Sequence, residues 1–365
     1  MAQAPPKILV LDGDGIGPEI VAATMTVLDA VQRRLGLELA FEHAAIGLAS
    51  LAREGTTFPD SVYERARAAD GIIIGPVSHH DYPPREKGGI NPSGELRRRL
   101  DLYANIRPAR SRPGCPPRFG KPIDLVICRE NTEGFYADRS MHLGPGEFMP
   151  TPDLALSVRK ISRAGSMRIA EAAFRLAAAR RKKVTAVHKA NVLRVSEGLF
   201  LDCARAVAAR NPGVAYEERL VDAMAALLVR DASAFDVVLT TNMFGDILSD
   251  EVAEIVGSLG LAASLNAGSD HAFAQAQHGS APDIAGQDRA NPASLIGSAA
   301  MLLDWLGARR GDRKLARAAT LIERALDRVL GTPEGRTADL GGPLGTRAFA
   351  ARVAAEVASL AVDAD

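Results

Sequence analysis

Five uninterrupted apolar runs constrain the fold of this chain more than any other feature of its sequence. They occupy residues 7–12, 71–76, 124–130, 184–189 and 235–242. Runs such as ILVL and GIII lack the polar alternation of a strand with one wet face, so each run is predicted to be a strand covered on both faces. Helical patterns lie between most of the runs, which indicates an α/β protein with a largely parallel sheet.

Stretches rich in alanine and stretches rich in proline and glycine divide the rest of the chain. Helices are predicted over residues 166–180, 202–209, 221–230 and 315–330. Proline and glycine concentrate at 108–122 and 143–152, so these segments are expected to be loops or an irregular arm.

Composition excludes several function classes. The 365 residues exceed what one hydrophobic core usually fills, so two domains are expected. With 44 Lys and Arg against 44 Asp and Glu, the chain has no broad basic field for nucleic acid or for a membrane surface. No targeting pattern precedes the first apolar run, so a cytoplasmic protein is expected. Three cysteines without CxxC spacing argue against a disulfide framework or a cysteine-built zinc site.

A glycine-rich turn, DGDGIGPE, follows the first apolar run at residues 12–19. Its Gly13, Gly15 and Gly17 do not have the G-x-G-x-x-G spacing of a dinucleotide fingerprint, and no GK[ST] follows to make a P-loop. The motif is therefore either a structural turn into a helix, which Pro18 suits as an early helical residue, or the lining of a site.

Three arginines are candidates for binding carboxylates. Arg97 lies in an arginine-rich stretch, where an ion pair with Asp101 four residues later on a helix is the simple alternative. Arg107 follows the helical pattern, and Arg129 ends an apolar strand, where a guanidinium is costly unless it meets an anion. Because a guanidinium binds a carboxylate bidentately, the three arginines predict a clamp for a di- or tricarboxylate in the ligand crevice of the sheet.

Asp246 and Asp250 have the most informative spacing in the chain. Carboxylates four residues apart on a helix project from one face, where they repel each other unless a cation binds. A position at the start of the helix would also match the helix dipole. Oxygen ligands suit a hard divalent cation, so a Mg²⁺ or Mn²⁺ site is predicted. Asp222 is a candidate third ligand, because a lone charge in its apolar helical stretch is expensive.

Two further side chains and one loop have both a functional and a structural interpretation. Lys189 directly follows an apolar strand and could transfer protons there, or simply be solvated. Tyr136 is either a site residue or a buried ring with a satisfied hydroxyl. Residues 278–292 are predicted to form a long ordered loop of the kind that often carries function.

In their order and spacing these motifs resemble those of the β-decarboxylating dehydrogenases, the family of isocitrate, 3-isopropylmalate, homoisocitrate and tartrate/D-malate dehydrogenases. The similarity runs through KILVLDGDGIGPE, LRRRLDLYANIRP, RENTEGFY, VHKANVL, VDAMA, NMFGDILSD, HGSAPDIAG and DLGG. It implies the two-domain α/β fold of isopropylmalate and isocitrate dehydrogenases, which is not a Rossmann fold. It also implies a homodimer with a large cofactor-binding domain at 1–102 plus 257–365. Residues 103–256 would form a small substrate and dimerisation domain with an arm near 138–160.

The resemblance also implies roles for the candidate residues. Asp246 and Asp250, with Asp222 of the partner subunit, would hold Mg²⁺ or Mn²⁺, and the three arginines would hold the carboxylates of the substrate. Lys189 of the partner subunit would help to remove the hydroxyl proton as hydride passes to the nicotinamide. After loss of carbon dioxide, Tyr136 would protonate the enolate to give a 2-oxo acid.

The resemblance favours NAD as the cofactor. Asp283 and Ile284 stand where NAD-using members place an acid that accepts from the ribose hydroxyls, and such an acid would repel the 2′-phosphate of NADP. The other expected cofactor contacts are Asn191, His278, Gly279, Ala281 and Asn291. The chain departs from most relatives in this loop, because their F-E-P-V-H-G is replaced by A-Q-A-Q-H-G at 274–279, with Gln275 in place of the acid.

The residues before the first arginine of the clamp bear on the substrate. Members that accept an isopropyl group carry leucines there, whereas this chain has NPSGE at 91–95. Asn91 and Ser93 stand where isocitrate enzymes bind the third carboxylate, although in swapped order. Homoisocitrate dehydrogenases share other stretches of the chain but place an arginine near Gly94. An isocitrate or homoisocitrate type substrate ranks first, D-malate or tartrate second and 3-isopropylmalate third.

A non-catalytic regulatory subunit is the alternative from another class of protein. Such a subunit would be expected to lose catalytic positions. Tyr136, Lys189 and the three aspartates are all present, which favours an enzyme.

Overall fold

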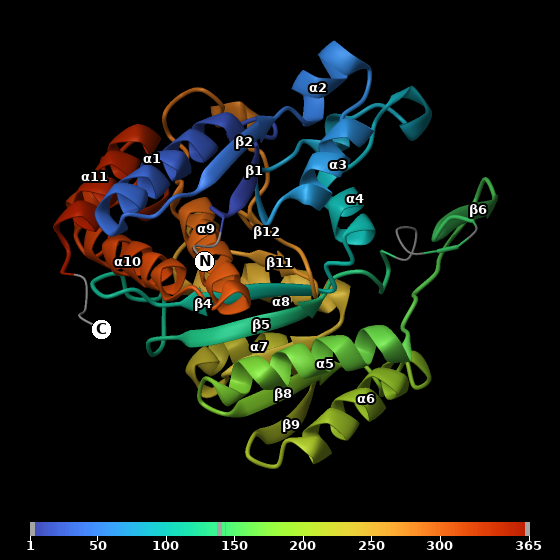
Figure 1. Ribbon diagram of the computed structural model, residues 1–365. Helices are drawn as coiled ribbons and strands as arrows, with labels where there is room; N and C mark the ends of the chain where they lie inside the picture. Colours follow the sequence, from blue (N-terminus) through green and yellow to red (C-terminus); the bar gives the residue numbers. More distant parts are fainter. Residues whose placement is uncertain (1–3, 137–140, 143, 362–365) are drawn as a thin grey trace.

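The structure is a computed structural model that describes residues 4–136, 141–142 and 144–361 (Figure 1). The strands are β1 (Lys7–Leu11), β2 (Ala40–Ala44), β3 (Gly71–Ile74), β4 (Ala104–Arg110), β5 (Asp124–Glu130), β6 (Glu147–Thr151), β7 (Leu154–Ser157), β8 (Lys183–His188), β9 (Ala215–Leu220), β10 (Val237–Thr240), β11 (Leu265–Ala267) and β12 (Ala272–Gln275). The α-helices are α1 (Gly17–Leu35), α2 (Gly47–Glu54), α3 (Asp60–Ala68), α4 (Pro92–Arg99), α5 (Arg163–Ala178), α6 (Ser196–Arg210), α7 (Val221–Asp231), α8 (Asn242–Val256), α9 (Ala293–Arg310), α10 (Arg313–Leu330) and α11 (Thr346–Ser359).

One mixed sheet organises the fold. Within the described residues it has ten strands in the order β2-β1-β3-β12-β11-β4-β5-β10-β8-β9. The five apolar runs form β1, β3, β5, β8 and β10, so the predicted strands and the α/β class are confirmed. The pairs β12–β11, β11–β4 and β4–β5 are antiparallel and the remaining pairs of this sheet are parallel, as expected of a largely parallel sheet. The predicted helices correspond to α5, α6, α7 and α10.

Two segments that were expected to be loops or an irregular arm contain strands. β4 runs into the proline-rich stretch as far as Arg110, and β6 lies within 143–152, of which residue 143 falls outside the described residues. The expectation overlooked that a proline fits a strand where one side has no ladder partner. β11 pairs with β4 only from Ala104 to Ile106, so at Pro108 the strand pairs with β5 alone.

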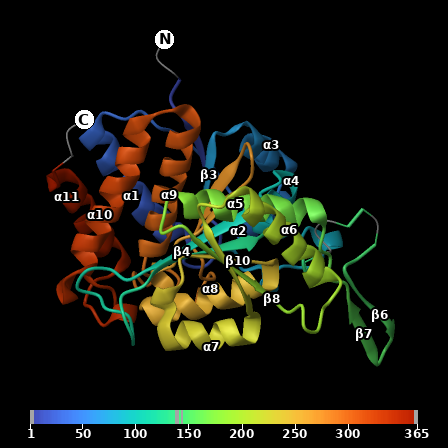
Figure 2. The ribbon, with the colours of Figure 1, turned by 90° about the horizontal axis from the view of Figure 1, so that it is seen from below.

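Helices cover both faces of the sheet, and the two ends of the chain build the same end of it. α1, α9, α10 and α11 pack on β1, β3, β11 and β12, and the first and last helices, α1 and α11, lie side by side (Figures 1 and 2). At the other end of the sheet, α5 and α6 cover one face of β5, β8 and β10, and α7 and α8 cover the other. The domain boundaries at 1–102, 257–365 and 103–256 stay a prediction.

The hairpin of β6 and β7 projects from the body of the molecule (Figure 2). It lies in the predicted arm segment near 138–160, of which residues 138–140 and 143 are outside the described residues. Every residue of both strands is exposed, including Phe148, Met149, Leu154 and Leu156. A lone two-stranded ribbon is only marginally stable in water, and exposed apolar side chains such as these are typical of interaction surfaces.

The glycine-rich turn packs against the predicted cofactor loop. Gly13 and Gly15 have φ values of 76° and 58°, which favour glycine. A Cβ on Gly15 would lie 2.0 Å from the carbonyl oxygen of Ser280. The turn leads into α1, which begins at Gly17 with Pro18 in its first turn, so the structural role is confirmed. Among the described residues, no helix has the length and apolar character to cross a membrane.

Candidate active site

Asp246 is the centre of an ionic cluster between α8, β4 and β5. The Nη1 atom of Arg107 lies 3.1 Å from Oδ1 of Asp246 and 3.6 Å from Oδ1 of Asp250. Arg129 donates from Nη1 to the same Asp246 oxygen. The hydroxyl of Tyr136 donates to Oδ2 of Asp246 at 3.1 Å. The structure therefore brings together five of the candidate residues.

Strand register and a close helix contact place the two arginines. β4 and β5 are antiparallel, with Asn105 opposite Arg129. Arg107 and Arg129 are only 6% and 2% exposed, and buried guanidiniums are costly without an anion. A Cβ on Gly245 would lie 2.7 Å from the Arg129 side chain, so the glycine lets α8 approach closely enough to present Asp246.

The charges in this cluster shift each other's pKa values. Burial lowers the pKa of Arg107 to about 10, and the nearby Arg129 acts in the same direction. Burial alone would raise the pKa of Asp246, but the charges of Arg129 and Arg107 outweigh it and the pKa is lowered. Asp250 is less closely paired, so burial dominates and its pKa is raised. Asp246 is thus the anion that compensates the arginines.

The expected contribution of the helix dipole is wrong. α8 begins at Asn242, and no acidic residue lies in its first turn. Asp246 and Asp250 follow one and two turns later, where the effect of the helix terminus has faded. The four-residue spacing still sets both carboxylates on one face, since Arg107 Nη1 is near both of them.

Arg97 lies in a network of amide side chains. Its Nε donates to Oδ1 of Asn266 at 2.9 Å, and its Nη2 donates to Oε1 of Gln275 at 3.4 Å. Gln275 in turn donates from Nε2 to Oγ of Ser93 at 2.8 Å. Asn105 donates to the same Asn266 oxygen at 2.6 Å. Neutral acceptors thus orient the guanidinium of Arg97 beside the buried Ser93.

Two details at α4 differ from the expectations. The helix ends at Arg99, so Asp101 lies beyond it with a φ of 49° and pairs with Arg168 at 2.5 Å. The alternative pairing of Arg97 with Asp101 is therefore wrong. Asn91 caps this helix, because its side-chain oxygen accepts from the backbone N–H of Gly94 at 3.1 Å.

Lys189 and Asp222 form a pair of their own. Nζ of Lys189 lies 2.8 Å from Oδ1 of Asp222, and this hydrogen bond lowers the pKa of the aspartate. Asp222 is in the first turn of α7 with 65% of its side chain exposed, so the expectation of a costly charge in apolar surroundings is wrong. Within the described residues, no group of three or more His, Cys, Asp or Glu side chains could hold a metal. Asp222 thus does not join Asp246 and Asp250 within one chain.

Glu197 is a site residue that the sequence analysis missed. It is fully buried, and its Oε2 accepts from the backbone N–H of Lys189 at 2.8 Å. Its Oε1 accepts from Arg159, which follows the hairpin and also donates to Oγ1 of Thr241 at 3.1 Å. An acid among the apolar residues of SEGLFL was the available signal. The ion pair joins the base of the hairpin to the Lys189 segment.

The predicted cofactor loop presents a buried polar atom without a partner. Nε2 of His278 is buried and makes no hydrogen bond within the described residues, and burial lowers the pKa of this histidine. Ala281 has a φ of 37°, and the exposed Asp283 follows in the short 3₁₀ segment Pro282–Ile284. Around Gly279, the space that a Cβ would need is open. These residues leave room and polar groups for a ligand.

Other residues near this loop have different surroundings. Asn291 donates to Asp339 at 3.0 Å and accepts from the backbone of Ala293 at 3.0 Å, so both ends of its side chain serve the structure. Asn191 is exposed beyond β8. Gln277 donates from Nε2 to Oδ1 of Asp250 at 2.6 Å. The loop therefore contacts Asp250, one of the predicted metal ligands, through this hydrogen bond.

The residues present fit the expected metal and dinucleotide. The shared contact to Arg107 shows that the carboxylates of Asp246 and Asp250 converge on one point, and carboxylate oxygens are what Mg²⁺ and Mn²⁺ prefer. A dinucleotide could satisfy Nε2 of His278, and the exposed carboxylate of Asp283 could accept from ribose hydroxyls.

Comparisons with known proteins identify the family of this chain. Residues 7–355 match the isocitrate/isopropylmalate dehydrogenase family, to which the chain therefore belongs. It is 43% identical over 356 residues to the isocitrate/homoisocitrate dehydrogenase of Thermus thermophilus, covering 97% of this chain and 99% of that protein. It is 40% identical over 350 residues to the 3-isopropylmalate dehydrogenase of Methanothermobacter thermautotrophicus, covering 95% and 97%. The crystal structure of isocitrate dehydrogenase from Methylococcus capsulatus has a TM-score of 0.85 and 39% identity, covering 97% and 99%.

The protein is accordingly a decarboxylating dehydrogenase that acts on a CH–OH group, and the predicted family and fold are confirmed. Enzymes of this family generally depend on Mg²⁺ or Mn²⁺ and on NAD or NADP, and they act on small hydroxy acids.

Proposed function

We propose that the chain catalyses the NAD-dependent oxidative decarboxylation of a 3-substituted malate to a 2-oxo acid, with Mg²⁺ or Mn²⁺. The observation that carries the proposal is the cluster around Asp246. Two buried guanidiniums, a second carboxylate and the hydroxyl of Tyr136 all lie within 3.6 Å of its carboxylate or of Arg107. This arrangement offers sites for an anion, a divalent cation and a proton within one small volume.

The polar surroundings of Arg97 support an isocitrate or homoisocitrate type substrate. The buried hydroxyl of Ser93 is held by Gln275 next to the guanidinium of Arg97, where an isopropyl group would meet polar atoms. The homoisocitrate dehydrogenase of Methanocaldococcus jannaschii is 39% identical over 353 residues, covering 93% of this chain and 94% of that protein. D-malate or tartrate ranks second. 3-Isopropylmalate ranks third, although several relatives carry that name.

In the proposed reaction the side chains bind the substrate and move protons. When bound, the divalent metal supplies Lewis acidity towards the hydroxyl and carboxylate oxygens of the substrate. Arg107 and Arg129 bind a substrate carboxylate. Lys189 of the partner subunit, in its neutral amine form, would take the hydroxyl proton while the hydride of the same carbon passes to NAD. Tyr136 donates a proton to the carbon that loses carbon dioxide. The acceptor oxygen of Asp246 holds the Tyr136 hydroxyl in place until then.

We further propose a homodimer with shared active sites. The exposed hairpin offers open edges for pairing, and Val229 of α7 and Ile247 of α8 are 50% and 58% exposed. Lys189 pairs with Asp222 apart from Asp246. A second copy could therefore bring its Lys189 and Asp222 to the Asp246 cluster.

Complementation between two inactive variants tests the shared site. Lys189→Ala and Asp246→Asn should each be inactive alone. Mixed after reversible dissociation, they should recover up to about one quarter of the wild-type activity, because half of the dimers are hybrids and each hybrid has one intact site. Mixing Lys189→Ala with Lys189→Met is the matched control. A mixture as inactive as this control would refute the shared site.

The cofactor preference is tested at Asp283. Asp283→Ala should lower the ratio of kcat/KM with NAD to kcat/KM with NADP by at least about tenfold, because the ribose loses its acceptor and the 2′-phosphate loses a repelling charge. Asp270→Ala, at another exposed turn, is the control. An unchanged ratio in the Asp283 variant would contradict the assignment of NAD.

The balanced charge of the chain supports a small-molecule substrate, with no nucleic acid or membrane as a partner. The cytoplasmic location stays a prediction.

A further inference from the structure

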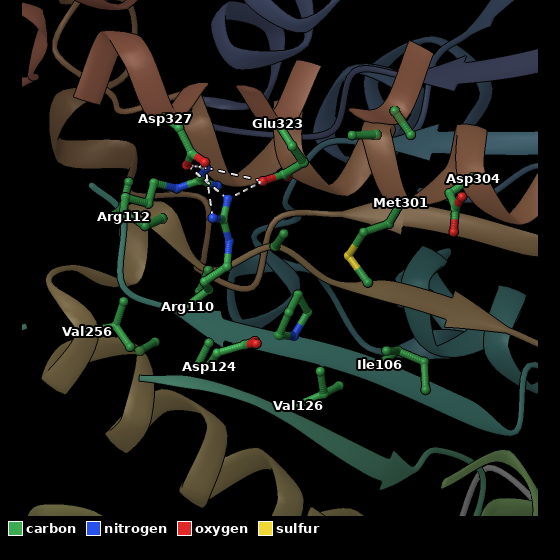
Figure 3. A pocket seen from close by; sticks show the side chains of 18 of the residues that line it. Ile106, Arg110, Arg112, Asp124, Val126, Val256, Met301, Asp304, Glu323 and Asp327 are labelled. Carbon is green, nitrogen blue, oxygen red and sulfur yellow. Dashed lines mark hydrogen bonds and ion pairs between the residues drawn. The ribbon is translucent and has the colours of Figure 1, made fainter. Parts of the chain in front are cut away.

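A pocket of about 550 Å³ opens between the sheet and the helices α9 and α10 (Figure 3). Its floor contains Ile106 of β4 and Val126 of β5, and Met301 of α9 lies above them. Val256 of α8 lines another side. Sheets and helices normally pack without voids larger than a water molecule, whereas a volume of this size and lining is typical of small-molecule sites.

The pocket lies behind the candidate active site. Successive side chains of a strand point to opposite faces of the sheet. On β4, Ile106, Pro108 and Arg110 of one face line the pocket together with Ala109 of the other face, whereas Arg107 reaches Asp246. α8 contributes to both places, because its carboxylates lie in the site while its last turn lines the pocket. A ligand here would contact α8 and β4, two elements that build the site.

At one end of the pocket, four charged side chains are paired with one another. Arg110 binds the Asp327 carboxylate bidentately, with Nη1 and Nη2 at 3.0 and 2.9 Å. Arg112 donates to Asp327 at 2.7 Å and to Glu323 at 3.2 Å. Two cations and two anions satisfy one another (Figure 3), so this end offers no net charge to a ligand.

The other end carries a carboxylate of a different kind. Asp304 lies beside Met301, away from the four paired charges (Figure 3). Asp304 is exposed, it has no hydrogen bond or ion pair within the described residues, and its partial burial raises its pKa. Asp124 and Arg180 of the lining pair with each other at 2.9 Å, and Arg324 also lines the pocket. Asp304 is the lining carboxylate without an ion pair within the described residues, and an organic ammonium group would complement it.

We propose that this pocket is an effector site for a small organic cation with an apolar body. The ammonium group binds Asp304, and the body lies over Ile106, Val126 and Met301. The site is separate from the one that carries the proposed reaction. Its ligand contacts α8 and β4, which also build the candidate active site.

Binding of phenethylammonium to the full-length protein, measured by calorimetry and by ligand-observed NMR without substrate, tests the proposal. The expected Kd is below about 1 mM. The matched neutral probe, 2-phenylethanol, should bind at least about fivefold more weakly. Asp304→Asn should weaken phenethylammonium binding by about the same factor. Met301→Lys, whose own ammonium can reach Asp304, should abolish it. Asp29→Asn, an exposed aspartate of α1, should leave it unchanged.

Several results would overturn the proposal. One is that phenethylammonium shows no saturable binding, and another is that 2-phenylethanol binds as tightly as phenethylammonium. A third is that the Asp304→Asn and Met301→Lys variants both bind phenethylammonium as tightly as the wild type. The effector role predicts that saturating phenethylammonium changes the Kd of Mn²⁺, measured by electron paramagnetic resonance, by at least about threefold. An unchanged Kd would refute that role. The ligand-binding readouts need neither turnover nor the metal, so their failure is distinguishable from failure of the proposed reaction. The Mn²⁺ readout applies once Mn²⁺ binding without the effector has been measured.

Discussion

Replacing Lys189 with alanine should lower kcat by at least about a thousandfold, the usual range for loss of a positioned proton-transfer group. The ammonium lies 2.8 Å from Asp222 at the end of β8, and its backbone is fixed by the buried Glu197. The fold should be intact, because the lysine side chain is partly exposed and buries no apolar core. Steady-state turnover with Mn²⁺, together with thermal unfolding, provides the measurement.

A second lysine of the same strand is the control. Lys183 begins β8 and pairs with Glu217 at 2.9 Å, far from the proposed chemistry. Lys183→Ala should retain turnover within about twofold, since such half-exposed ion pairs contribute little. Undiminished kcat in the Lys189→Ala variant would remove this residue from the mechanism. Equal losses in both variants would mean that the effect is structural.

Asp246→Asn should weaken Mn²⁺ binding by at least about a hundredfold and kcat/KM by about a thousandfold. The carboxylate is a proposed metal ligand and the partner of two guanidiniums that are almost fully buried. Losing its charge should also lower the free energy of unfolding by about 2 kcal/mol, because Arg107 and Arg129 are left undercompensated. Mn²⁺ titration and urea unfolding measure the two effects separately.

Glu251→Gln on the same helix is the matched control, because Glu251 is a half-buried carboxyl that makes no contact with the arginines. It should change Mn²⁺ affinity by less than about threefold. Tight Mn²⁺ binding by the Asp246→Asn variant would contradict the proposed metal site, even if turnover were lost.

The strands that the sequence predicted are those buried on both faces. β1, β3, β5, β8 and β10 read as continuous apolar runs because helices cover each side. β2 and β9 are the two edges of the sheet. β2 is mostly exposed and β9 is mostly half-exposed, so their mixed sequences carry no comparable signal. β4 was not predicted as a strand because it contains Pro108. The proline fits there because the partner strand β11 ends before that position.

The candidate site was predictable where the chemistry is local in sequence. The four-residue spacing of Asp246 and Asp250 survives in α8, although the start of the helix was misjudged. The amides around Arg97 were not predictable, because Asn266 and Gln275 reach it through pairings between strands far apart in the chain. Glu197 was missed for the same reason, since its partner Arg159 lies beyond the hairpin.

The position of Asp222 shows a different limit. Its apolar neighbours in sequence suggested a buried charge, yet the helix turns the side chain outward to meet Lys189. An arrangement that depends on a second copy of the chain leaves no trace in the periodicity of one sequence.

NADH formation in the presence of Mn²⁺, compared across isocitrate, homoisocitrate, D-malate, tartrate and 3-isopropylmalate and repeated with NADP, tests the proposed function most directly. We expect isocitrate or homoisocitrate with NAD to give a kcat/KM at least about tenfold above the other acids, as a site built to bind a polar group should. A preference for 3-isopropylmalate would contradict the role of Ser93 and Arg97 in substrate selection. No turnover with any of the five acids would contradict the proposed reaction.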